Sequence, residues 1–312
     1  MTTKKRRNDK TNLNRTLNNK KSKSLKLSKK IKTSKKIKKF KKLNCSPNKK
    51  LSFTCYSTKS IYKLKNLWNE KYPNKKISSN EPKIIWEKLK ENLNSTCSNE
   101  RCWLNQQFIK NNISKDFFDN TFAPSAPPTW KEDPNTWLNS LDINNVMNQY
   151  EKTYKNFKFI GPSPIDFDHK KMFGQCVWNE LCNFNLKKYI DNGITKIGII
   201  FNTDPHYLGG AHWICLFINI HLKFIYYFDS NADKTPTEIT KFIKRIKGQA
   251  KNLGIELDEI VNKTEHQKKN TECGIYVLYV ISELLKSNKF PNIFINRIPD
   301  KEMEKLRKVY FN

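Results

Sequence analysis

Residues 212–229 read HWICLFINIHLKFIYYFD, and this stretch decides the fold of the region around it. It contains two runs of apolar, β-branched and aromatic residues, 212–219 and 223–229, with a short connection between them. Two such runs in succession predict a β-hairpin. The outer ends of the two predicted strands are occupied by a histidine and an aspartate.

The register of this hairpin decides whether those two end residues meet. A turn centred between Ile220 and His221 places His212 directly across from Asp229. Cross-strand partners have Cβ atoms about 4.5–5.5 Å apart, which allows an imidazole–carboxylate hydrogen bond. The turn lacks an Asn-Gly pair, so the symmetry of the two runs alone sets this register.

A cysteine further along the chain stands at a predicted helix start. Residues 275–285 are apolar on nearly every side, and Asn270 or Thr271 is a suitable N-cap for the helix. Cys273 then lies in the first turn, where unpaired N–H groups and the helix dipole favour a thiolate. Gly274 behind it allows close approach of another backbone.

Four residues thus follow one another in the order His212, Asp229, Gln267 and Cys273. A thiol needs an imidazole to form thiolate, and the imidazole needs a carboxylate to fix its tautomer. A side-chain amide can donate to the oxyanion of a tetrahedral intermediate. Each residue alone has an ordinary reading: a strand end, a turn, a loop residue and a buried helix cysteine. Their joint order indicates a cysteine endopeptidase.

The segment from about residue 155 to 312 resembles the catalytic domain of the ubiquitin-like-protein protease and adenovirus protease superfamily. The resemblance rests on four short motifs that match that family's chain order: His212-Trp213, Asp229-Ser230, Gln267 and Cys273-Gly274. One departure is Glu272, where the family usually has aspartate. The stretch GPSPIDFD at 161–168 and the basic N-terminal extension resemble processing peptidases of large DNA viruses, of the African swine fever virus type.

This resemblance implies a role for each matched residue. Cys273 would be the nucleophile, His212 the general base and acid, Asp229 the residue that orients His212, and Gln267 the oxyanion donor. Trp213 would wall the substrate channel and narrow it to small residues, with Gly274 beside it as a second substrate-binding position.

Strands and helices alternate around these motifs. The pattern predicts a helix over 175–190, a buried strand over 194–201, and a helix after a capping box at 235–238. A strand over 255–262 and an amphipathic helix over 300–310 complete the region. Strands flanked by helices, with a mixed sheet that holds the hairpin, predict an α+β domain.

Charge and composition divide the chain into three predicted parts: 1–50, 51–150 and 151–312. The first part has a net charge of +20 of the total +30 and few large apolar side chains, so it is expected to be a disordered basic tail. Such a tail can bind nucleic acid without sequence preference, although genome composition or a nuclear localisation signal would also explain it. The second part reads as a mostly helical accessory region with a helix near 80–95, and the third as the catalytic domain.

The eight cysteines have irregular spacing, which does not indicate a disulfide framework in a chain of 312 residues. Cys97 with Cys102, and Cys176 with Cys182, are the pairs to consider as metal ligands, but no CxxC pair occurs. We therefore expect neither a metal nor a cofactor. No signal peptide is apparent, and the apolar runs are too short to span a bilayer.

Three functions remain open at this stage. The first is cleavage of viral structural precursor proteins after Gly-Gly-X type sequences, in the virion and at the assembly site in the host cytoplasm, with the nucleus as another location. The second is removal of a ubiquitin-like modifier of the SUMO type from proteins. The third is a non-catalytic packaging protein that binds nucleic acid through its tail. This function does not explain why His212, Asp229, Gln267 and Cys273 occur in that order.

Overall fold

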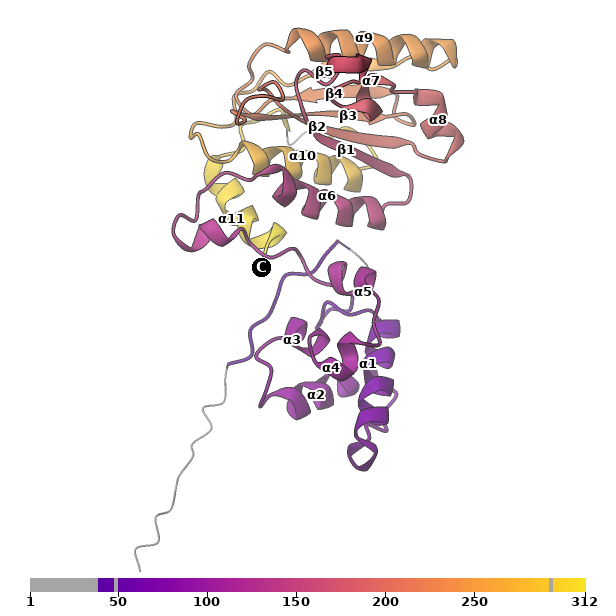
Figure 1. Ribbon diagram of the computed structural model, residues 1–312, viewed down its shortest axis with the longest axis vertical. Coiled ribbons are helices and arrows are strands. Elements are labelled where there is room, and N and C mark those ends of the chain that lie inside the picture. The colour runs from indigo at the N-terminus through magenta and orange to yellow at the C-terminus, as the bar shows by residue number, and fades with distance from the viewer. Residues whose placement is uncertain (1–38, 48–49, 292–293) are drawn as a thin grey trace, which may run out of the picture. The chain divides into compact units, whose positions relative to one another are not determined.

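The computed structural model describes residues 39–47, 50–291 and 294–312, and its centre is a mixed five-stranded sheet (Figure 1). The strands lie in chain order. The three central strands are antiparallel, and each edge strand runs parallel to its neighbour. The bounds are β1 Phe157–Pro164, β2 Lys196–Asn202, β3 Trp213–Asn219, β4 Phe224–Phe228 and β5 Asp258–Val261.

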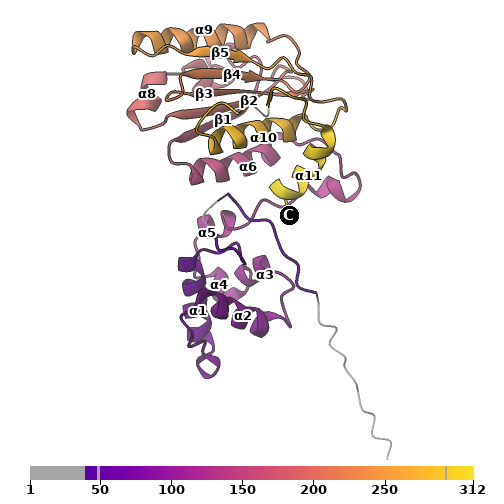
Figure 2. The ribbon, with the colours of Figure 1, turned by 180° about the vertical axis from the view of Figure 1, so that it is seen from behind.

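Helices cover both faces of the sheet, which Figures 1 and 2 show from opposite sides. One face packs against the apolar sides of α6 (Ser140–Thr153), α10 (Cys273–Lys286) and α11 (Asp300–Tyr310). The other packs against α7 (Asn179–Cys182), α8 (Leu186–Asp191) and α9 (Thr237–Asn252). Every residue of β3 and β4 is buried, because both of their faces are covered. The predicted α+β class is confirmed.

The hairpin exists, but its register differs from the predicted one by two residues. Cys215 pairs with Phe228, and Asn219 with Phe224, so the connection has four residues instead of two. The side chain of Asn219 accepts a hydrogen bond from the amide of Leu222 at 2.9 Å, and Lys223 adopts a positive φ of 52°. Side chains alternate faces with a period of two, so this shift leaves each residue on its predicted face.

Several predicted element boundaries need correction. Helix α9 begins at Thr237 without the predicted capping box, because its N-cap residue is Pro236, whose side chain has no hydrogen-bond acceptor. Residues 175–190 form α7 and α8 instead of one helix, since the side chain of Asn185 caps a new start by accepting from the amide of Lys188. The strand predicted over 255–262 is limited to β5. By contrast, β2 and α11 lie where the pattern predicts them.

Five further helices precede the sheet and share a core of their own. Their bounds are α1 Thr58–Lys71, α2 Pro82–Leu93, α3 Glu100–Leu104, α4 Gln107–Lys110 and α5 Lys115–Asp119, and the short 3-10 helices are η1 Pro73–Lys75, η2 Pro128–Lys131 and η3 Met172–Gly174. Helix α6 begins within the predicted part 51–150 and ends three residues beyond it, and its apolar face belongs to the core of the sheet. The limits of the three parts otherwise stay predictions.

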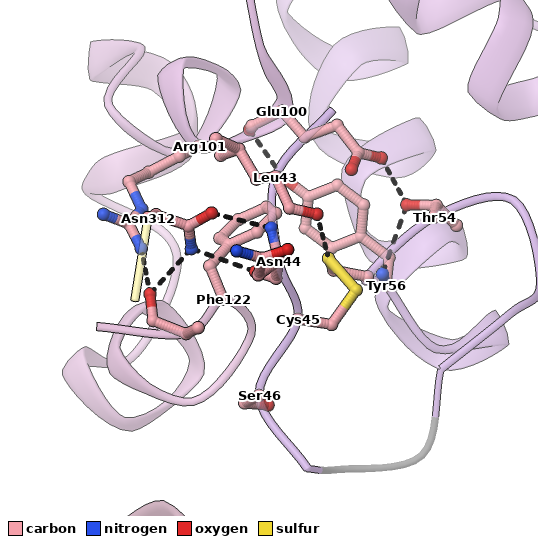
Figure 3. The surroundings of a disulfide bond; sticks show 12 residues. Leu43, Asn44, Cys45, Ser46, Thr54, Tyr56, Glu100, Arg101, Phe122 and Asn312 are labelled. Atoms are coloured by element: carbon pink, nitrogen blue, oxygen red, sulfur yellow. Dashed lines mark hydrogen bonds between the residues drawn. A yellow bond between two sulfur atoms is a disulfide. The ribbon is translucent and has the colours of Figure 1, made fainter. Parts of the chain in front are cut away.

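Part of the segment predicted to be disordered makes defined contacts, which Figure 3 shows. The amide of Asn44 donates to the side chain of Asn312 at 2.6 Å, and that side chain donates back to the Asn44 carbonyl at 3.0 Å. Leu43 is buried, and Cys45 is joined to Cys55. Disorder throughout 1–50 is therefore wrong for 41–46, whereas 1–38 lie outside the described residues.

Three disulfides contradict the expectation of no disulfide framework: Cys45–Cys55, Cys97–Cys102 and Cys176–Cys182. Each closes a loop of ten residues or fewer, and local turns rather than regular spacing bring the partners together. The pairs considered as metal ligands are two of these bridges. Within the described ranges no group of three metal-binding side chains gathers, and no helix has the length and apolarity to cross a membrane.

Candidate active site

The hairpin brings His212 and Asp229 together at its open end. His212 directly precedes β3 and Asp229 directly follows β4, and the imidazole Nε2 lies 2.7 Å from the carboxylate Oδ1. The buried carboxylate is itself held, because its Oδ1 also accepts from the amide of Asn231 at 2.9 Å. With Nε2 engaged in this bond, Nδ1 is the ring nitrogen that remains for a second partner.

That second partner is Cys273, the first residue of α10. The thiol is buried, and its sulfur is close enough to the imidazole of His212 to influence the pKa of that ring. Burial opposes protonation of the ring, but the hydrogen bonds and negative charges of Asp229 and Cys273 outweigh it and raise the pKa of His212 to about 10. At neutral pH His212 is therefore an imidazolium, which lies close to the sulfur of Cys273.

Gln267 is oriented by its neighbour in the turn after β4. The hydroxyl of Ser230 donates to the Gln267 Oε1 at 2.8 Å, and the backbone amide of Gln267 donates to the Ser230 carbonyl at 2.9 Å. Because the carbonyl end of the amide is taken, Nε2 is the end left to donate. This is the orientation that an oxyanion donor requires.

Gln267→Ala is expected to lower kcat by a factor on the order of 10²–10³ with little change in KM, as when another preorganised amide donor is removed. The control is Gln249→Ala, because Gln249 bonds only the start of α8 and the Phe184 carbonyl. Steady-state kinetics on one peptide compares both variants. A change confined to KM would make Gln267 a substrate-binding residue instead.

A buried ion pair holds the start of α10, next to Cys273. Glu272, the N-cap of α10, is fully buried, and both its oxygens accept from Nε of Arg307 at 3.0 and 2.8 Å. The same guanidinium donates to the carbonyls of Thr136 at 2.8 Å and Thr271 at 2.9 Å. The predicted caps, Asn270 and Thr271, are not used, since Arg307 fixes the helix start through Glu272.

Removing one partner of a buried ion pair leaves an uncompensated charge. Arg307→Met is therefore expected to lower the free energy of unfolding by about 3–5 kcal/mol. Lys187→Met serves as the control, because it breaks an exposed pair with Asp191 and should cost less than about 1 kcal/mol. Urea denaturation measures both, and equal effects would show that the buried pair does not stabilise the fold.

A cleft of about 580 Å³ lies beside the histidine. Its walls include Ala211 and Trp213, the two neighbours of His212, and also Trp137 and Leu138 from the segment before α6. The indole of Trp213 is buried and donates to the Leu138 carbonyl at 2.9 Å, so it both packs in the core and walls the cleft.

Gly274 allows the segment that carries Leu138 to approach helix α10 closely. A Cβ at Gly274 would lie 3.0 Å from the Leu138 Cβ, so a larger side chain would displace that wall of the cleft. Leu138 and Trp137 were not predicted as site residues. The Asn139–Asp142 capping box that starts α6 is the signal that could have found them.

Comparison with known proteins adds to this geometry. Residues 179–312 match the Ulp1 protease family, C-terminal catalytic domain. A protein of Acanthamoeba polyphaga mimivirus that is named as a thiol protease is 30% identical over 293 residues, which are 86% of this chain and 92% of the relative. The chain belongs to the Ulp1 protease family. It is a viral thiol protease of that family.

Other relatives of this Ulp1-type protease agree. A cysteine protease of African swine fever virus, named a SUMO-1 cysteine protease, is 26% identical over 180 residues, which are 54% of this chain and 66% of the relative. The crystal structure of the African swine fever virus protease has a TM-score of 0.62 and 19% identity, and the match covers 86% of this chain and 95% of that one. That likeness concerns the fold.

Proposed function

We propose that this protease cleaves viral structural precursor proteins after small residues of the Gly-Gly-X type. The observation that carries the proposal is the single arrangement of His212, Asp229 and Cys273, beside a cleft walled by Trp213. The viral relatives support a role in the maturation of particles, at the assembly site in the host cytoplasm and in the virion.

In the proposed mechanism, the Cys273 thiolate attacks the scissile carbonyl carbon, and the carbonyl electron pair moves to oxygen. Gln267 Nε2 and the amide at the start of α10 donate to that oxyanion. As the tetrahedral intermediate collapses, the C–N bond breaks and the His212 imidazolium gives its proton to the leaving amine. Water, deprotonated by the neutral His212, then attacks the thioester and releases the acid and Cys273.

The indole of Trp213 supports the preference for small residues. Its Nε1–H bond to the Leu138 carbonyl fixes the ring in one position, so it forms a rigid wall next to His212. A rigid wall excludes side chains that a flexible one would accommodate. Glycine next to the scissile bond also allows the extended backbone to lie close to the wall.

The test compares wild-type and Cys273→Ala protein on candidate precursors and on ubiquitin-like fusions. Cleavage of precursors after small residues by the wild type alone supports the proposal. Exclusive cleavage of the fusions would favour the second candidate, removal of a SUMO-type modifier, which the family description and the African swine fever virus relative's name support. Equal cleavage by Cys273→Ala protein would exclude both.

The third reading, packaging through nucleic-acid binding, concerns the basic tail. Residues 1–38 lie outside the described residues, and the contacts of 41–46 mean that a deletion should end at residue 38. Deleting 1–38 is expected to leave peptide cleavage intact and to remove most affinity for DNA, which in the intact protein should fall steeply with salt. Filter binding at low and moderate salt measures this. Equal affinity and salt slope in both proteins would place any polyanion site elsewhere.

A further inference from the structure

Large apolar side chains that remain exposed gather around the cleft. The described residues expose twelve such side chains, and six of them lie on three of the four segments whose residues line it. We name these six the apolar rim: Trp137, Leu141, Met172, Phe173, Tyr207 and Leu208. Single exposed apolar residues are ordinary on a protein surface, whereas several around one concave site indicate a contact surface.

One part of the rim is a turn that displays its side chains outward. Met172 is 80% exposed and Phe173 is 95% exposed. Hydrogen bonds close this turn, from the Lys171 amide to the Gln175 carbonyl at 2.7 Å and from the Gly174 amide to the Lys171 carbonyl at 3.1 Å. Phe173 has a positive φ of 64°, which is uncommon for a bulky residue. The turn therefore presents an apolar tip from a defined backbone.

A second part of the rim is held by polar contacts. The amide and Nδ1 of His206 lie 2.9 and 2.6 Å from the carboxylate of Asp166, and the Gly210 amide donates to Asp204 at 3.1 Å. These bonds fix the loop that carries Tyr207 and Leu208. Because the loop is already ordered, little entropy is lost when its apolar side chains contact a ligand.

The position of the cleft identifies its occupant. Its lining continues to Ala211 and Trp213, which flank His212, so a polypeptide cut at Cys273 passes along it. Small residues fit beside Trp213, but they offer almost no apolar surface. Trp137 and Leu208 of the rim line the same cleft, and each of the other four rim residues stands within two positions of a residue that lines it, so the rim can contact side chains that flank the small residues.

We infer that the apolar rim binds bulky apolar side chains of the substrate polypeptide, next to its small residues at the scissile bond. This inference rests on the proposed function and adds to it a requirement for the substrate's flanking sequence. Partial burial of one leucine or phenylalanine corresponds to about tenfold in kcat/KM. The gain should appear mainly in KM, because the rim holds the substrate away from the reacting bond.

The experiment uses peptides with one Gly-Gly-X core and leucine–phenylalanine or serine–serine flanks, placed either before or after the core. Two variants remove parts of the rim, Met172→Ser with Phe173→Ser, and Tyr207→Ser with Leu208→Ser. Two matched controls, Ile84→Ser and Leu222→Ser, remove exposed apolar side chains on segments that contribute no residue to the cleft. All proteins are full length, and circular dichroism verifies their folding.

The expected result is that wild type and controls cleave peptides with apolar flanks on at least one side with a kcat/KM about tenfold higher than serine-flanked peptides. A rim variant should lose this preference and should cleave the serine-flanked peptide like wild type. A wild type indifferent to both flanks overturns the inference, and so does a preference that both rim variants keep. Those outcomes leave the proposed function standing. Absence of wild-type cleavage of every peptide, with no labelling of Cys273 by a Gly-Gly probe carrying a thiol-reactive group, overturns both.

Discussion

Cys273→Ala protein is expected to lose peptide hydrolysis, with kcat lower by a factor on the order of 10⁴ or more. The physical reason is that no other group near His212 can form the thioester. Cys215 is the matched control, because it is the other buried cysteine that the described part of the chain leaves outside a disulfide. Burial, together with the charge of Asp229, raises the pKa of the Cys215 thiol, so it stays protonated and inert.

Hydrolysis of a Gly-Gly peptide, measured after circular dichroism confirms folding, tests this expectation. Cys215→Ala should retain the chemistry, and the loss of its packing in the sheet core should lower only the stability. Residual cleavage in Cys273→Ala protein above that of the buffer would show that the assigned nucleophile is wrong.

His212→Ala is expected to lose nearly all activity and to change the pH dependence of thiol alkylation. A raised pKa of about 10 means that the imidazolium of His212 persists as pH falls through neutrality and loses its proton only as pH rises through about 10. Because His212 stays charged between about pH 6 and 8, Cys273 in the wild type should react faster with iodoacetamide in that range than Cys273 in His212→Ala protein. In His212→Ala protein, the alkylation rate should rise with pH as it does for an unperturbed cysteine thiol, whose pKa is about 8.5.

Two further variants sharpen this test. Asp229→Asn should lose less activity than His212→Ala, because the amide still accepts a bond from the ring but no longer supports its charge. His221→Ala, in the exposed turn after β3, should behave like wild type. The same alkylation profile in wild-type and His212→Ala proteins would be incompatible with a thiolate–imidazolium pair.

Short-range patterns predicted much of this fold and of the candidate site. The two apolar runs predicted the hairpin, and helix α10 begins at Cys273 as its apolar body indicated. The register was wrong by two residues because the bond from the Leu222 amide to Asn219 favours a longer turn, which no Asn-Gly pair announces. A register shift of two residues does not change the face of the sheet on which a side chain lies, so His212 and Asp229 still meet as predicted.

Contacts between distant segments could not be predicted in this way. The Arg307–Glu272 pair joins residues 35 positions apart, and neither residue stands in a pattern that identifies its partner. Leu138, which forms part of the cleft wall, lies 75 positions before its hydrogen-bond partner Trp213, in the part predicted to be an accessory region. Such contacts depend on how α6 and α11 pack against the sheet, which periodicity within each helix does not determine.

The four-residue turn after β3 has a practical consequence for studies on surfaces. β3 has seven residues, and at about 3.3 Å per residue it separates the turn from His212 by roughly 23 Å. His221 and Leu222 are exposed in this turn, which is two residues longer than the two-residue turn of the tightest hairpins. A dye or an immobilisation handle attached at this turn would hold every molecule in the same orientation and leave the opposite end of the hairpin open to a captured precursor.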